Sequence, residues 1–163
     1  MNRKILKVTQ MLMVAGIIAI LAACGKDNVK DNNNELPANV KELLVERKWQ
    51  VVSMVPDKDV DIDGNGTIDK DFQLLAEDCE KDDYTVYTGD GLVFFEEGSK
   101  VCDETPDPET RWELVNKSSL KISQATESYV LTIKSISADK LVLVQSIDVW
   151  GTSVKITITF KKI

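Results

Sequence analysis

The chain has 163 residues, of which 27 are acidic, 20 are basic, three are cysteine and none is histidine. Without histidine, Ser-His-Asp and Cys-His nucleophilic sites and histidine-based zinc motifs are excluded, and an enzyme is the least favoured class of protein. The net charge of -7 argues against nucleic acid as a partner, because lysine and arginine bind the phosphate backbone.

The N-terminus has the pattern of a secretory signal peptide, which we assign to residues 1–23. Basic residues come first, and the run 8–23 is almost wholly apolar and uncharged. This run is shorter than the ~20 residues that span a bilayer comfortably. It ends at Leu21-Ala22-Ala23-Cys24, and these small residues before a cysteine resemble the lipobox of bacterial lipoproteins.

The lipobox resemblance implies cleavage before Cys24 and attachment of lipid to the sulfur and amine of that residue. A diacyl group plus an amide-linked chain exceeds the two signals that stable anchoring takes, so we expect an outer-membrane lipoprotein of the cell envelope. Ordinary cleavage, or an uncleaved anchor, is the alternative. Residues 24–35 are mostly polar, which predicts a flexible tether. The sequence leaves open whether the protein faces the periplasm or the cell surface.

Two short helices are predicted before the main run of strands. In Leu36–Arg47, Pro37 suits a first helical turn and several apolar residues share one side. Around Asp71–Glu77 the apolar residues again lie on one side. Most of the remaining chain has a different periodicity.

That remainder alternates between apolar and polar residues, or forms short apolar runs between turn residues, as strands do. The last segment alternates most clearly, with branched or aromatic residues on one face and lysine and threonine on the other. Eight strands are predicted, at Trp49–Val55, Tyr84–Thr88, Leu92–Glu96, Arg111–Val115, Leu120–Ser123, Tyr129–Ser135, Leu141–Ile147 and Val154–Lys161.

Eight strands joined mostly by short loops form an antiparallel meander, which we assign to one domain over residues 36–163. Such a sheet removes its exposed edges by closing into an up-and-down barrel. We therefore predict an all-β fold, a single eight-stranded barrel with a short N-terminal helix. A β-sandwich is the alternative. The interior of such a barrel is just wide enough for side chains or one small ligand.

Several features of the domain occur in a characteristic order. They are Trp49 after a short helix, the Asp-Gly loop Asp61–Asp69, Cys79–Asp83, Asp90-Gly91, Cys102, Trp112 and the closing strand Ile156–Lys161. This ordered set, which extends over residues 36–163, is similar to the lipocalin-like domain of bacterial lipoproteins. The similarity implies a barrel without catalytic residues and, by analogy with lipocalins, a small apolar ligand.

Cys79 and Cys102 are the two cysteines that remain once Cys24 carries lipid. In an oxidising envelope an even pair predicts a disulfide, which would join the segment before the second strand to the loop after the third. A reactive thiol is the alternative, but it needs a positively charged neighbourhood, and both cysteines have acidic neighbours.

The sharpest local motif is a possible cation loop. Oxygen-bearing side chains recur at alternate positions, in Asp61, Asp63, Asn65, Thr67 and Asp69. With glycine at the sixth position, this resembles the first nine positions of a calcium-binding EF-hand loop. The twelfth position, which should be a bidentate carboxylate, is Phe72. A calcium (Ca2+) site is one interpretation, and a surface turn whose Asp side chains bond their own backbone is the other.

The three tryptophans are candidate ligand contacts. Trp49 and Trp112 begin predicted strands, where a core position is the favoured interpretation and a ligand contact is the alternative. Trp150 lies in the loop before the last strand, where an exposed ring would contact a partner or ligand.

Two functions are compatible with these features. The first is a lipid-anchored, monomeric binding module that holds a small, largely apolar ligand in its barrel. The second is a structural or interaction lipoprotein, whose barrel is filled by its own side chains and whose surface docks another envelope protein. No cofactor is expected apart from calcium at Asp61–Asp69.

Overall fold

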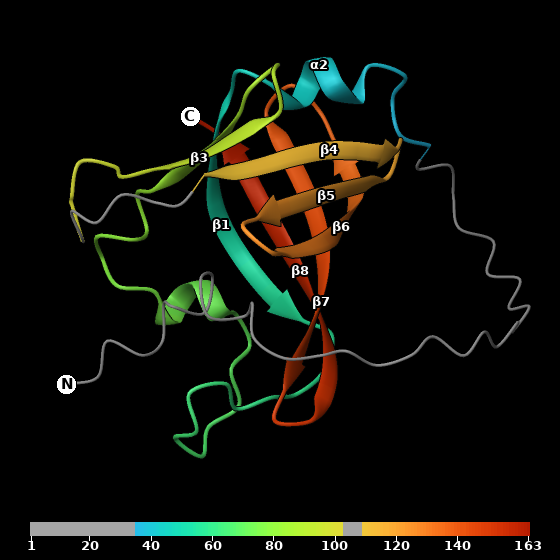
Figure 1. Ribbon diagram of the computed structural model, residues 1–163. Helices are drawn as coiled ribbons and strands as arrows, with labels where there is room; N and C mark the ends of the chain where they lie inside the picture. Colours follow the sequence, from blue (N-terminus) through green and yellow to red (C-terminus); the bar gives the residue numbers. More distant parts are fainter. Residues whose placement is uncertain (1–34, 103–108) are drawn as a thin grey trace, which may run out of the picture.

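The computed structural model describes residues 35–102 and 109–163, whose strands form one closed β-barrel (Figure 1). The predicted signal peptide, Cys24 and most of the predicted tether lie outside these residues. Eight antiparallel strands follow one another around the barrel: β1 (Lys48–Pro56), β2 (Tyr84–Tyr87), β3 (Leu92–Glu96), β4 (Thr110–Asn116), β5 (Ser119–Gln124), β6 (Glu127–Ile136), β7 (Lys140–Val149) and β8 (Thr152–Lys162). In the described parts of the chain, no helix is long and apolar enough to cross a membrane.

The alternation of apolar and polar residues determines which side of each strand faces inward. In β8 every second residue from Val154 to Phe160 is buried, and the lysines and threonines between them are more exposed. β8 pairs along its length with β7, and from Ile156 onward it also pairs with β1. This last pairing closes the barrel and leaves neither β1 nor β8 as a free edge.

The closed barrel confirms the predicted fold class and excludes the β-sandwich alternative. The predicted helices are too long. The helix expected over Leu36–Arg47 is reduced to α2 (Val40–Leu44), because Val45 leaves the helix to form a parallel bridge with Tyr87. The helix expected around Asp71–Glu77 is a single 3-10 turn, η1 (Phe72–Leu75).

Helix α2 covers the end of the barrel at which β1 begins, which we call the closed end (Figure 1). Val40 and Leu44 are buried on its inner side. Trp49 lies next to them, fully buried, and its indole N–H donates to the carbonyl oxygen of Leu44 at 2.9 Å. The hydrogen bond joins the end of the helix to the first strand and so holds α2 against the barrel.

Cys79 and Cys102 form the predicted disulfide, with their Cα atoms 5.4 Å apart. Cys79 precedes β2 and Cys102 follows β3, so the bridge ties together the two ends of the β2–β3 hairpin that lie opposite its turn. Because both sulfur atoms belong to this bond, neither position has a free thiol.

Candidate functional site

Strands β6 and β7 pair along only part of their lengths. The pairing extends from Ile136↔Leu141 to Thr132↔Val144. Beyond that point, among the described residues, the first half of β6 pairs only with β5 and the second half of β7 only with β8. Figure 1 shows the reason: β4 and β5 run across the barrel while β7 and β8 run from top to bottom. We call the space where β6 and β7 diverge the β6–β7 seam.

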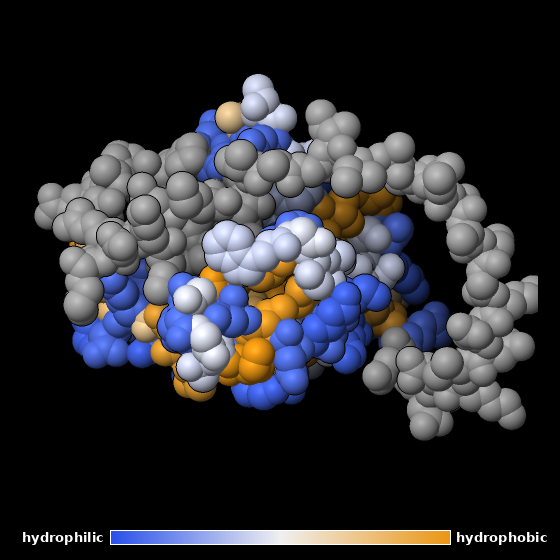
Figure 2. All heavy atoms as spheres, turned by 90° about the horizontal axis from the view of Figure 1, so that it is seen from below, coloured by the Kyte–Doolittle hydropathy of each residue, from blue (hydrophilic) through white to orange (hydrophobic). Residues whose placement is uncertain are grey.

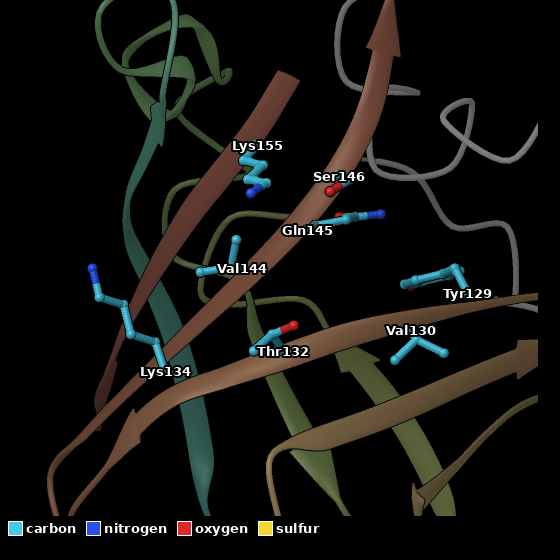
Figure 3. Close-up of a pocket in the computed structure, with 8 residues that line it drawn as sticks. All are labelled: Tyr129, Val130, Thr132, Lys134, Val144, Gln145, Ser146 and Lys155. Atoms are coloured by element: carbon cyan, nitrogen blue, oxygen red, sulfur yellow. The ribbon is translucent and has the colours of Figure 1, made fainter. Parts of the chain in front are cut away.

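A pocket of about 400 Å3 opens at the β6–β7 seam. This volume lies within the roughly 300–1,000 Å3 that is typical of small-molecule sites. Side chains from three adjacent strands line it: Tyr129, Val130, Thr132, Lys134, Val144, Gln145, Ser146 and Lys155 (Figure 3). Two of the eight, Val130 and Val144, are apolar, and the other six carry groups that can form hydrogen bonds, so the pocket suits an amphipathic molecule.

Two polar side chains border the pocket from the interior. Along β6 and β7 the inward-facing positions are mostly aliphatic. Two of them are instead Tyr129 in β6 and Gln145 in β7, and both side chains are partly buried. A tyrosine hydroxyl is protonated at neutral pH and can donate a hydrogen bond, and burial raises the pKa of Tyr129 further. The inner side of the pocket therefore offers hydrogen-bonding groups that carry no charge.

Aromatic side chains fill the interior next to this pair. Tyr87 in β2 is 3% exposed, and burial, together with the nearby Tyr129, raises its pKa. Its ring packs edge-to-face against Trp112, with the ring centroids 5.8 Å apart. Trp112 is itself buried and donates from its indole N–H to the carbonyl oxygen of Thr88 at 3.0 Å.

The structure places Trp49 and Trp112 in the core. Both belong to one cluster of buried side chains that fills the barrel interior, from Leu141 and Phe160 near the closed end to Ile147, Val149 and Val154 near the β7–β8 turn. Trp112 also borders a smaller hollow of about 290 Å3, between α2 and the β2–β3 turn. Buried side chains thus extend along the barrel interior, and none of them lines the pocket at the β6–β7 seam.

Trp150 is exposed at the β7–β8 turn, with 81% of its side chain accessible. Its backbone has a φ of 53°, and its indole N–H donates to the carbonyl oxygen of Asp61 at 3.2 Å. Figure 2 looks at this side of the molecule and shows hydrophobic atoms exposed in the middle of the face, between hydrophilic ones. The indole therefore connects the β7–β8 turn to the predicted cation loop.

The cation loop brings three of its five predicted residues together. One carboxylate oxygen each from Asp61, Asp63 and Asp69 lies within 4.8 Å of the other two. The Asn65 side-chain oxygen instead accepts the backbone N–H of Thr67 at 2.7 Å, and Thr67 is exposed. The three aspartates are thus the candidate ligands that the fold assembles.

Backbone N–H groups partly offset the repulsion between these carboxylates. Asp61 accepts the N–H groups of Asn65 at 3.0 Å and Gly66 at 2.6 Å, and Asp69 accepts that of Ile62 at 2.9 Å. Desolvation opposes ionisation of Asp61, but these N–H groups outweigh it and lower its pKa. The loop therefore has the backbone hydrogen bonds expected of a surface turn and also the clustered negative charge expected of a calcium site.

The residues of the seam pocket were not predicted as site residues. Lys134 and Lys155 alternate with inward-facing residues and look like ordinary solvent-facing charges. Gln145 could have been noticed in the sequence, because it is a polar residue in a row of inward-facing leucine, isoleucine and valine residues in β7. The next two inward residues of β7, Ile147 and Val149, are apolar and buried again, so Gln145 is a single polar position within an apolar row.

The comparisons with known proteins agree with this architecture. A family model described as a lipocalin-like domain matches residues 45–143, more than half of the chain. Searches of curated proteins and of solved structures found no match. The matched segment extends from the first strand into β7 and includes the Trp49, cation-loop and disulfide positions that carry the sequence resemblance. The chain therefore belongs to the lipocalin-like domain family.

Proposed function

We propose that this protein is a non-catalytic binding module, anchored to the cell envelope by lipid on Cys24, that holds a small, largely apolar ligand. The observation that carries the proposal is the pocket of about 400 Å3 at the β6–β7 seam of a lipocalin-like barrel. Its lining supplies apolar contact from Val130, Val144 and the ring of Tyr129, and polar side chains that can fix the orientation of a ligand.

The seam suits a ligand better than the centre of the barrel does. At the closed end the inward positions are occupied by buried side chains such as Leu120 and Leu141, both 0% exposed. At the seam, Val130 is 54% exposed and Tyr129 is partly buried, so apolar surface remains for a ligand to cover. Removing this surface from water would supply the affinity.

Native mass spectrometry of the protein purified gently from its own envelope tests the proposal. We expect the wild type to carry a bound small molecule. Ser146→Trp places a large ring in the pocket from an exposed position and should abolish this added mass. Glu96→Trp, at an exposed position of β3 that does not line the pocket, should retain it.

An interaction lipoprotein is the alternative function, and exposed hydrophobic side chains favour it. They include Val55, Ile68, Leu74 and Trp150, with exposed fractions of 44%, 44%, 75% and 81%. A wild-type protein without a bound small molecule, but with a stoichiometric envelope protein attached, would replace the ligand proposal with this one.

Lipid anchoring predicts that Cys24→Ala moves the protein out of the membrane fraction or leaves it as an unprocessed precursor. The sulfur of Cys24 is the acceptor that the lipobox resemblance implies, and alanine has none. Fractionation and immunoblotting measure both effects, with Asn28→Ala in the predicted tether as the control. Cys24→Ala protein with wild-type size and location would contradict the anchor.

The cation loop is proposed to bind calcium, which would stabilise the loop rather than take part in a reaction. Three carboxylates that converge within 4.8 Å repel one another, and a divalent cation relieves that repulsion. Calcium added at 100 times its dissociation constant would stabilise the fold by about 2.7 kcal/mol. This corresponds to a rise in melting temperature of roughly 5–10 °C for a domain of this size.

Thermal melts in millimolar calcium and in excess chelator measure this shift. Asp63→Asn should remove it, whereas Asp59→Asn, at an exposed carboxylate paired with Lys70, should not. Trp150 provides a second readout, because its indole binds Asp61 and its fluorescence should respond to calcium. Equal melting temperatures with calcium and with chelator would leave the surface turn as the correct interpretation.

A further inference from the structure

We infer that the pocket at the β6–β7 seam selects an anionic amphiphile, with Lys134 and Lys155 binding its charged head. This inference rests on the proposed ligand-binding function and specifies the class of ligand. It is carried by the charge of the pocket lining and by the positions of the charged and apolar residues within it.

The lining has the opposite charge to the protein as a whole. The chain has 27 acidic and 20 basic residues, yet the residues around this pocket include two lysines and no carboxylate. Neither lysine has an ion-pair partner within 4.0 Å in residues 35–102 and 109–163. The carboxylate of Asp57 lies near Lys155 but accepts its backbone N–H, at 2.9 Å. Two ammonium groups are thus available to a ligand.

The charged and apolar parts of the pocket lie at different places. In Figure 3, Lys134 and Lys155 lie on either side of Val144, with Lys134 directed away from Lys155, and Tyr129 and Val130 lie at the far side of the pocket. An elongated molecule with an anionic head at the lysines would lay its apolar chain toward Tyr129 and Val130. Gln145 and the protonated Tyr129 hydroxyl border that path without adding charge.

The expected preference is moderate because both lysines are exposed. A solvent-exposed ion pair contributes about 0.2–1 kcal/mol, so each lysine should change affinity by up to about fivefold. Two lysines acting on one head group should together favour an anion about tenfold over a neutral analogue. Because salt screens such pairs, the preference should decrease as ionic strength rises.

Calorimetric titration of the full chain carrying Cys24→Ser, which removes the lipid acceptor, tests the inference. Decanoate and the uncharged decanamide share one apolar chain, and inorganic phosphate supplies an anion without a chain. We expect decanoate to bind about tenfold more tightly than decanamide, and phosphate to show no binding at the same concentration. Lys134→Met and Lys155→Met should each weaken decanoate about threefold to fivefold and leave decanamide unchanged.

Lys161→Met is the matched control, since Lys161 lies on the same outer face of β8 as Lys155 but at the closed end. It should leave decanoate affinity within twofold of wild type. Equal binding of decanoate and decanamide would overturn the inference and leave the ligand-binding function intact. Phosphate binding as tight as that of decanoate would also overturn it. If neither amphiphile binds and the protein purified from its own envelope carries no small molecule, both the inference and the proposed function fail.

Discussion

Replacing Trp49 with alanine is expected to lower the free energy of unfolding by about 4 kcal/mol. The side chain is fully buried between α2 and the barrel, so its removal leaves a cavity that the surrounding strands cannot close. The change also removes the hydrogen bond from the indole to the carbonyl oxygen of Leu44. Urea denaturation, followed by circular dichroism, measures the loss.

Trp150→Ala is the matched control for this experiment. It removes the same side chain from a position that is 81% exposed, so the cost should stay below about 0.5 kcal/mol. Trp49→Phe keeps most of the buried volume and should fall between the two. Equal unfolding midpoints for Trp49→Ala and Trp150→Ala would show that Trp49 does not hold the closed end together.

Removing the disulfide with Cys79→Ala and Cys102→Ala is expected to lower the free energy of unfolding by about 3 kcal/mol. The bridge joins cysteines 23 positions apart, and opening that loop increases the entropy of the unfolded chain. The barrel strands contain neither cysteine, so the native fold should persist.

Chemical reduction of the wild-type protein provides an independent control, because it breaks the same bond without changing any residue. Reduction and the double substitution should shift the urea midpoint by the same amount. Free thiols at both positions in the untreated protein, measured by alkylation and mass spectrometry, would contradict the disulfide.

The barrel could be predicted from sequence because its strands alternate almost without interruption. The segment predicted as Val154–Lys161 is β8, Thr152–Lys162, and that predicted as Leu92–Glu96 is β3 without change. A register slip of one residue would turn each buried face to solvent, so the pattern specifies the pairing strongly. The end of α2 had no such local signal, because it depends on the bridge from Val45 to the distant Tyr87.

The site was harder to predict because it arises from the relative directions of strands. The divergence of β6 and β7 depends on where their pairing stops, after Thr132 and Val144, and the polar Gln145 that follows does not by itself predict it. Lys134 and Lys155 belong to different strands, and only the fold brings them to one pocket. The cation loop and the disulfide were accessible from sequence because each depends on local spacing or on a single pair of residues.

The most direct test of the account is a map of amide chemical-shift changes as decanoate is added to the isotope-labelled protein. We predict changes concentrated at Tyr129–Thr132 in β6, Val144–Ser146 in β7 and Lys155 in β8. Changes centred on Trp49, Leu120 and Phe160 would place the ligand inside the barrel near its closed end. That result would contradict a site at the β6–β7 seam. The absence of any change at saturating decanoate would contradict binding of this ligand altogether.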